Sequence, residues 1–248
     1  MQLDLEGKLA LVTGASSGIG AATAELLAAE GVDVIVGYRG NEAGADATVA
    51  AVESHGRTAR RCRMDVADAA DVKRAIAQLD LGERGLDILV QSSGVAPVGD
   101  LRELPADEWQ HVVAVNLNGP FYVLQAVTPF LRDGAAVVNV ASVAGQTGVP
   151  HQAHYAAAKA GVINLTKSAA RALAPRVRVN CVAPGMTLTE MGQITATALP
   201  ADYAEKKLLL QRFAEPQEIA HCIVFLASGA AGFITGETLN ANGGRDLR

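Results

Sequence analysis

The stretch Thr13-Gly14-Ala15-Ser16-Ser17-Gly18-Ile19-Gly20 decides the fold. It follows the apolar run 9–12 and leads directly into an alanine-rich segment of helical period. Gly14 permits a tight turn, Gly18 lets the backbone approach a pyrophosphate, and Gly20 lets the helix lie close to the sheet. We therefore expect a dinucleotide-binding loop. Its expected ligand-binding residues are Gly14, Ser16, Ser17, Gly18, Ile19 and Gly20.

Beyond this loop, short apolar runs alternate with longer helix-like stretches. The runs that we predict to be buried strands are 9–12, 32–36, 58–62, 88–90, 136–140 and 177–182. This alternation is typical of an α/β, Rossmann-type doubly wound parallel sheet with helices on both faces. We find no repeat or linker that would divide the chain, so residues 1–248 are expected to form one dinucleotide-binding and catalytic domain.

The least regular segment is 186–214, which follows Pro184-Gly185 and shows no clear strand. Ligands of doubly wound sheets bind beyond the carboxyl ends of the strands. We therefore expect this segment to be a substrate loop, and an ordinary surface excursion is the alternative.

Composition excludes several classes of protein. The chain has 248 residues, a formal net charge of −5, few aromatic residues and scattered basic residues, which argues against a nucleic-acid partner. The first seven residues lack the basic and apolar regions of a signal peptide, and no apolar run is long enough to span a membrane. Cys62, Cys181 and Cys222 are widely spaced and are interpreted as buried free thiols, so we expect a cytoplasmic protein.

The expected end of the second strand reads Gly37-Tyr38-Arg39. A dinucleotide fold that binds NAD usually offers an acidic residue to the adenosine ribose at this place. No acid stands here, and the Arg39 guanidinium could pair with a 2′-phosphate, so NADP(H) is favoured over NAD(H). The alternative for Arg39 is a solvated loop charge. Asp65 and Val66, just past the third strand, would lie over the adenine, although Asp65 could instead cap a helix.

A second group of residues points to proton transfer. Ser142 closes the fifth strand, and Tyr155 and Lys159 follow in His154-Tyr155-Ala156-Ala157-Ala158-Lys159. Residues four apart on a helix share one face, so the Lys159 ammonium can lie beneath the Tyr155 phenol. A nearby cation favours the phenolate, so we expect it to lower the pKa of Tyr155 toward neutral pH, as general acid–base catalysis requires. Ser142 can hold a carbonyl oxygen.

With these residues in view, nearly the whole chain resembles the short-chain dehydrogenase/reductase family. The shared marks are the 13–20 loop, Asn116, the set Ser142, Tyr155 and Lys159, Pro184-Gly185, and the ending Ile234-Thr235-Gly236 through Asn242-Gly243-Gly244. The resemblance implies about seven parallel strands and a homotetramer or homodimer. Helices around 112–131 and 162–173 would form one interface, and the C-terminal segment would form another.

The resemblance also implies roles for single residues. Asn116 would position a water relay to Lys159, Ser142 would orient the substrate, and Tyr155 would transfer the proton. Lys159 would also bind the nicotinamide ribose. The implied cofactor contacts in the second half of the chain are Tyr155, Lys159, Pro184, Gly185, Thr187 and Thr189, the two threonines holding the nicotinamide carboxamide and phosphate.

One turn departs from the family. After the fourth strand the family usually has Asn-Asn-Ala-Gly, whereas this chain has Gln91-Ser92-Ser93-Gly94. Gly94 still allows close approach to the adenosine ribose, and Gln91 and Ser92 can still form hydrogen bonds. We expect altered cofactor affinity or stability, with the chemistry kept. His151 and His154 are interpreted as pocket lining, His151 being the expected substrate contact, and no metal site is expected.

The whole pattern predicts an NAD(P)-dependent oxidoreductase acting on alcohols or carbonyls. The glycine-rich loop and the C-terminus look most similar to 3-oxoacyl-carrier-protein reductases, so we expect NADPH-dependent reduction of a β-ketoacyl or small cyclic ketone. The substrate would be a small molecule or carrier-linked, and neither nucleic acid nor membrane is expected as a partner. An oxidative NAD-dependent alcohol or sugar dehydrogenase and a non-catalytic dinucleotide-binding protein are the alternatives.

Overall fold

A seven-stranded, wholly parallel sheet forms the centre of the protein, in the order β3-β2-β1-β4-β5-β6-β7. The computed structural model describes residues 3–197 and 199–247. The strands are β1 Leu9–Thr13, β2 Asp33–Tyr38, β3 Ala59–Arg63, β4 Leu86–Gln91, β5 Leu131–Val140, β6 Val177–Pro184 and β7 Thr238–Ala241. The expected doubly wound α/β fold is confirmed.

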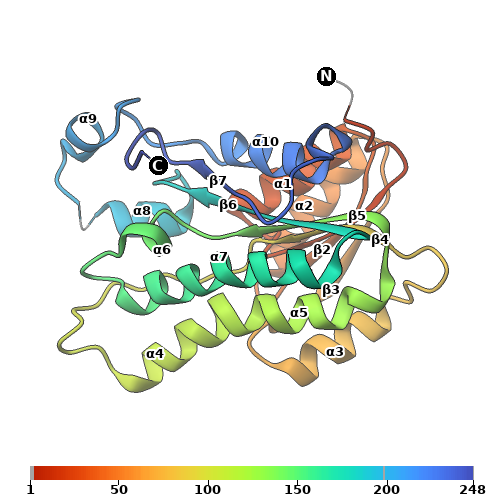
Figure 1. Ribbon diagram of the computed structural model, residues 1–248, viewed down its shortest axis with the longest axis horizontal. Coiled ribbons are helices and arrows are strands. Elements are labelled where there is room, and N and C mark those ends of the chain that lie inside the picture. The colour runs from red at the N-terminus through yellow and green to blue at the C-terminus, as the bar shows by residue number, and fades with distance from the viewer. Residues whose placement is uncertain (1–2, 198, 248) are drawn as a thin grey trace.

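Helices cover both faces of the sheet, as Figure 1 shows. On one face lie α1 Gly18–Ala29, α2 Glu42–Ser54 and α10 Pro216–Ala227. On the other face lie α3 Ala69–Gln78, α4 Ala106–Val113, α5 Gly119–Val127 and α7 Ala153–Leu173. The short helix α6 Ala144–Thr147 precedes α7.

The protein has one hydrophobic core on each face of the sheet, and the side chains of the central strand β1 alternate between them. Ala10 and Val12 of β1 pack with α1 and α10, whereas Leu9 and Leu11 pack into the opposite core with α3 and α5. Successive side chains of a strand point to opposite faces, so a strand that is covered on both faces needs an uninterrupted apolar run. The apolar burial ends at Thr13, where the glycine-rich loop begins.

The expected strands agree in position with β1 to β6. The expectation that 58–62 is a buried strand was wrong, because β3 is an edge strand in which Cys62 alone is buried and the three arginines are exposed. The strand β7 was not among the segments predicted from apolar runs, because its sequence Thr-Leu-Asn-Ala is short and only partly buried. The 186–214 segment contains two short helices, α8 Glu190–Ala196 and α9 Tyr203–Lys207. An isolated β-bridge between Thr187 and Ala214 joins the two ends of this segment, so the segment forms a loop whose ends are held together.

The strand order places the candidate site. The chain builds the sheet outward from β1 to β3 and then returns to add β4 on the other side of β1. In sheets of this kind the ligand crevice opens where the direction reverses, beyond the carboxyl ends of the strands. The loops after β1 and β4 therefore face the expected ligand. None of the helices in the described part of the chain is long and apolar enough to cross a membrane.

Candidate active site

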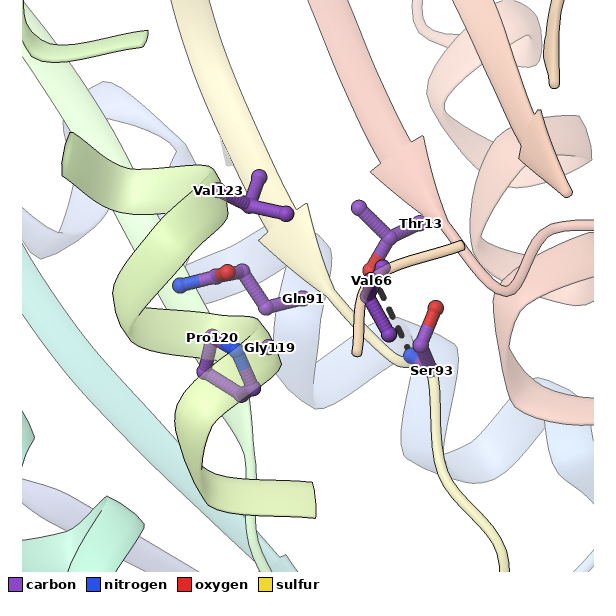
Figure 2. Close-up of a pocket in the computed structure, with 7 residues that line it drawn as sticks. All are labelled: Thr13, Val66, Gln91, Ser93, Gly119, Pro120 and Val123. Carbon is purple, nitrogen blue, oxygen red and sulfur yellow. Dashed lines mark hydrogen bonds between the residues drawn. The ribbon is translucent and has the colours of Figure 1, made fainter. Parts of the chain in front are cut away.

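The loops after β1 and β4 lie against each other at this reversal point. The Thr13 hydroxyl accepts hydrogen bonds from the backbone N–H groups of Ser92 (3.2 Å) and Ser93 (3.3 Å), the second of which is drawn in Figure 2. Gly14 has a positive φ of 66°, and a Cβ there would lie 2.8 Å from the Ser93 Cα. Only glycine fits between the two loops at this place.

The start of α1 has the properties of an anion site. The helix begins at Gly18, its first turn contains no acidic residue, and the Ser17 side chain forms no capping hydrogen bond. A Cβ at Gly20 would lie 2.3 Å from the Gly14 carbonyl oxygen, so a side chain there would push the helix away from the loop. The free N–H groups of a helix N-terminus favour a phosphate. This donor set fits a pyrophosphate.

The turn Gln91-Ser92-Ser93-Gly94 lacks the paired asparagines of the family, and different side-chain hydrogen bonds connect it to the sheet. The Gln91 side-chain nitrogen donates to Asn139 Oδ1 (2.9 Å), and Asn139 Nδ2 in turn donates to the Thr166 hydroxyl (2.8 Å). The buried Gln91 Oε1 has no hydrogen-bond partner among the described residues. Figure 2 shows Gln91 pointing toward Pro120 and Val123, beside a cavity without room for a water molecule. The departure therefore leaves one buried carbonyl oxygen unsatisfied, which costs about 1–3 kcal/mol.

Asn116 lies in a single turn of π-helix, Ala114–Asn118, between α4 and α5. Its side-chain nitrogen donates to the carbonyl oxygens of Val95 (2.8 Å) and Val112 (2.9 Å), and its Oδ1 accepts from the Val95 N–H (3.3 Å). Turns of this kind are rare and are found mostly at functional sites. Here the side chain of Asn116 attaches the loop after β4 to the α4–α5 helix.

Gly94 lies between Asn116 and Lys159. A Cβ at Gly94 would lie 2.8 Å from Asn116 Oδ1 and 3.7 Å from Lys159 Nζ. The absence of a side chain at Gly94 therefore permits Asn116 and Lys159 to approach the same loop. The sequence grouped these residues only through the family resemblance, whereas the structure brings them into one place.

Ser142, Tyr155 and Lys159 meet beyond the end of β5. Ser142 lies just after this strand and hydrogen-bonds to Tyr155 near the start of α7. Lys159 Nζ lies 5.6 Å from the centroid of the Tyr155 ring and donates to the Val140 carbonyl oxygen at 2.8 Å. The four-residue spacing does place the ammonium group under the phenol ring, as expected.

The titration behaviour differs from the sequence expectation. Burial raises the pKa of Tyr155 above its ordinary value, and the hydrogen bond from Ser142 only partly offsets this effect. Burial also lowers the pKa of Lys159 to about 8. Removing a charged group from water disfavours its charged form, whether that form is a phenolate or an ammonium ion. The expectation that Lys159 lowers the pKa of Tyr155 was wrong for this structure, because the pattern of residues did not reveal that Lys159 is buried and that Tyr155 is partly buried beside it.

Comparisons with known proteins agree with this geometry. The family model described as "Enoyl-(Acyl carrier protein) reductase" matches residues 14–246. A 3-oxoacyl-[acyl-carrier-protein] reductase, FabG, of Staphylococcus aureus is 42% identical over 243 residues, which cover 96% of this chain and 97% of the relative. The chain belongs to the short-chain dehydrogenase/reductase family. It is therefore an NAD(P)-dependent oxidoreductase.

Solved structures of the short-chain dehydrogenase/reductase family superimpose over the whole chain. A protein of Brucella melitensis described as "Short-chain dehydrogenase/reductase SDR:Glucose/ribitol dehydrogenase" has a TM-score of 0.93 at 34% identity, covering 100% of both chains. A short-chain dehydrogenase of Burkholderia cenocepacia, solved in complex with NADP, has a TM-score of 0.92 at 35% identity and covers 98% of this chain and 99% of its own.

Of the family positions at and after the end of β6, Thr189 lies beside the glycine-rich loop. A Cβ at Gly18 would lie 3.0 Å from the methyl carbon of Thr189, so the start of the 186–214 segment lies over the loop. The Thr189 hydroxyl accepts from the Gly192 N–H (3.0 Å) and caps α8, while the Thr187 hydroxyl donates to the Gly185 carbonyl (3.2 Å). The Pro184 carbonyl accepts from the Val143 N–H (3.0 Å), which links β6 to the turn after Ser142.

The residues expected at the adenosine end of the cofactor follow β2 and β3. Arg39 Nη1 lies 3.8 Å from Asp65 Oδ2, and both residues line a cavity of about 350 Å³ together with Arg63, Asp71 and Arg74. Asp65 does not cap the following helix, because Asp68 caps α3. Val66 is buried and packs against Gly119. Guanidinium groups beside an open cavity fit a phosphate, so this donor set agrees with a 2′-phosphorylated cofactor.

The two histidines differ in their surroundings. His154 is fully buried, with Nε2 3.2 Å from Glu108 Oε1 on α4, whereas His151 is exposed and its carbonyl oxygen accepts from the Gly99 N–H. In the described part of the chain no three potential ligands form a metal-binding cluster. No sequence pattern pointed to Thr13 or Arg63 as residues of the site. Their positions at the ends of β1 and β3 were the only available signal.

Proposed function

We propose that this protein reduces a ketone to a secondary alcohol with NADPH, and that its substrate is a β-ketoacyl group carried as a thioester on an acyl carrier, or a small cyclic ketone. The observation that carries the proposal is the meeting of Ser142, Tyr155 and Lys159 beyond the end of β5. The 3-oxoacyl-[acyl-carrier-protein] reductase that is 42% identical to this chain supports the substrate class.

The proposed reaction divides between the cofactor and the protein. A bound nicotinamide would supply the hydride that reaches the carbonyl carbon. Ser142 would hold the carbonyl oxygen by a hydrogen bond, and Tyr155 would donate its phenolic proton to that oxygen. The raised pKa of Tyr155 keeps the phenol protonated at neutral pH, which is the form that a general acid needs for reduction. The Lys159 ammonium would then stabilise the phenolate that remains.

Residues at the adenosine end support NADP(H) over NAD(H). Arg39 follows β2 where NAD-binding members of the fold carry an acidic residue, and its guanidinium faces the 350 Å³ cavity. The Burkholderia relative was solved with NADP. We also propose that Thr187, Thr189, Pro184 and Gly185 contact the nicotinamide end, since Thr189 lies beside Gly18 of the glycine-rich loop and the other three closely precede it in the chain.

Two other activities have specific support. The Brucella relative is described as a glucose/ribitol dehydrogenase, which favours an oxidative reaction on a sugar or alcohol. The family model is described by enoyl reduction, which reduces a carbon–carbon double bond. The third possibility is a dinucleotide-binding protein without catalytic activity. It requires that the unusual turn at Gln91 abolish turnover.

A panel of substrates tests the proposal. NADPH oxidation is followed with a β-ketoacyl thioester, a cyclic ketone and an enoyl thioester, and the reverse reaction is followed with sugars and NAD. We expect activity on the ketones and a loss of about 10²–10⁴-fold in Tyr155→Phe. Equal rates in wild type and Tyr155→Phe would contradict the mechanism. Tighter binding of NAD(H) than of NADP(H), unchanged in Arg39→Ala, would contradict the cofactor assignment.

Assembly and location complete the proposal. A homotetramer or homodimer is proposed from the family, and a cytoplasmic location is proposed because an acyl-carrier-linked substrate and reduced thiols both suit that compartment. The three cysteines are free thiols; Cys62 and Cys181 are buried as expected, whereas Cys222 is only half-buried.

A further inference from the structure

Four arginines lie on or beside β3, the edge strand next to Arg39, and their contacts differ. Arg57 pairs with Asp33 and Glu6, and Arg61 pairs with Asp46 at 2.8 Å while it lies over the Tyr38 ring. Arg60 donates to the Leu79 carbonyl oxygen. Arg63 forms no ion pair with any carboxylate of residues 3–197 or 199–247.

Arg63 is nevertheless held at a defined place. Its Nε donates to the Arg39 carbonyl oxygen at 3.2 Å, which fixes the start of its guanidinium group beside the loop after β2. Register supports this placement, because Arg63 pairs with Tyr38 across the β2–β3 ladder, one residue before Arg39. The remaining nitrogens of the guanidinium are free to bind a ligand.

The charges around the cavity are unbalanced. Arg39, Arg63 and Arg74 line it together with Asp65 and Asp71, which gives an excess of one positive charge. Arg74 is already engaged by Asp71. Arg39 lies at the long distance of 3.8 Å from Asp65 on a half-exposed surface, and such a contact contributes little and is readily exchanged for a phosphate.

We propose that Arg63 is a second specificity-determining residue, which clamps the cofactor's 2′-phosphate together with Arg39, its neighbour in the lining of the same cavity. This inference rests on the NADP(H) preference proposed above. A phosphate within reach of two guanidinium groups from neighbouring strands accepts charge-assisted hydrogen bonds from both of them. A free 2′-hydroxyl offers no negative charge to either group, so Arg63 would discriminate between the two cofactors without contacting the nicotinamide.

The test measures binding of the adenosine half alone. Adenosine 2′,5′-bisphosphate and 5′-AMP are titrated by calorimetry into wild type, Arg63→Gln, Arg63→Lys and Arg61→Gln. Arg61→Gln is a matched control, because it removes the same charge from the same strand at a side chain already paired with Asp46. We expect Arg63→Gln to weaken the bisphosphate about tenfold with 5′-AMP within about twofold of wild type, and Arg63→Lys to restore part of the loss.

The outcomes separate this inference from the proposed function. Wild-type binding of the bisphosphate by Arg63→Gln, or equal weakening by Arg63→Gln and Arg61→Gln, would overturn the role of Arg63. If wild type itself prefers 5′-AMP and NADH, then the NADP(H) assignment fails first and the clamp fails with it. If wild type prefers NADPH over NADH and Arg63→Gln shows the same preference, the proposed role of Arg63 is overturned and the NADP(H) assignment stands. Thermal unfolding of each variant checks that the fold is kept.

Discussion

Lys159 is an ammonium group that the protein buries almost completely. The residue is 4% exposed, its ammonium group donates to the Val140 carbonyl oxygen, and burial lowers its pKa to about 8. Tyr155 beside it has a raised pKa for the same reason. A buried charge of this kind is costly to the folded state and is typical of a site selected for chemistry.

The pH dependence of ketone reduction should follow the loss of the proton from Lys159. The Tyr155 phenol stays protonated at high pH because its pKa is raised, so the loss of positive charge at Lys159, through about pH 8, comes first. We expect kcat/KM for reduction to be level below this point and to fall by about tenfold per pH unit above it. The measurement is a kcat/KM profile from about pH 6 to about pH 10, with structure monitored by circular dichroism. A profile that stays level across this whole range would show that the Lys159 charge is not needed.

Removal of the buried charge should stabilise the protein. The unfolded chain holds the Lys159 proton up to a pKa of 10.5, whereas the folded protein releases it at about 8, so the penalty is fully present below pH 8 and is relieved between these values. We expect Lys159→Met, without added cofactor, to raise the free energy of unfolding at pH 7 by roughly 1–3 kcal/mol and to abolish reduction.

Denaturant titrations at about pH 7 and about pH 10 measure this effect. The gain should shrink at the higher pH, because the wild-type protein then keeps a neutral Lys159 when folded and pays little for its burial. A variant that is less stable than wild type at neutral pH would mean that the bond to Val140 outweighs the burial of the charge.

At the scale of elements, the loop after β4 connects the sheet to the helices of the site. Thr13 holds its first residues, Asn116 in the π-helical turn bonds both the N–H and the carbonyl oxygen of Val95, and Gln152 donates to the Ala96 carbonyl oxygen. Three elements distant in sequence thus fix one short loop. The position of Asn116 relative to Lys159 depends on this loop, since Gly94 lies between them.

A side chain at Gly94 should therefore separate Asn116 from Lys159. In Gly94→Ala the new Cβ would lie 2.8 Å from Asn116 Oδ1, so the loop or the π-helical turn must shift. We expect kcat to fall at least about tenfold and the free energy of unfolding to fall by roughly 1–3 kcal/mol. Gly99→Ala is the control in the same loop, because its Cβ would meet Leu104 and Glu108 at ordinary contact distances of 3.4 and 3.5 Å. Equal effects of the two substitutions would refute a specific role for Gly94.

These elements also show what the sequence could and could not predict. The central strands were predictable because parallel strands covered on both faces read as apolar runs. At the edges of the sheet, the 58–62 segment located β3 but not its exposure, and β7, which has four residues and none of them buried, was missed. The spacing of Tyr155 and Lys159 predicted their shared helix face. The direction of the pKa of Tyr155, the π-helical turn at Asn116 and the unpartnered Gln91 oxygen depend on contacts between distant segments, which no local pattern contains.

At the scale of the whole molecule, the two edges of the sheet differ. The edge strand β3 has the sequence Ala-Arg-Arg-Cys-Arg, and charged side chains on an edge discourage pairing with another chain. The opposite edge strand β7 has the sequence Thr-Leu-Asn-Ala and carries no charge. Near it lies Phe233, whose side chain is fully exposed at 105%. An exposed aromatic residue beside an uncharged edge is typical of a surface that pairs with a second copy.

Subunit association should therefore depend on Phe233. We expect wild type to be a tetramer with one interface at β7 and another along α5 and α7, as the family resemblance implies, and Phe233→Asp to leave dimers. Phe121→Asp, at a 45% exposed residue of α5, should break the other interface, and Leu101→Asp, 62% exposed in the loop after β4, is the control that leaves the mass unchanged. Light scattering after size exclusion measures each mass at micromolar concentration. A monomeric wild type, or an unchanged mass in Phe233→Asp, would mean that the β7 edge stays free in solution, and the exposed Phe233 would then require a different partner.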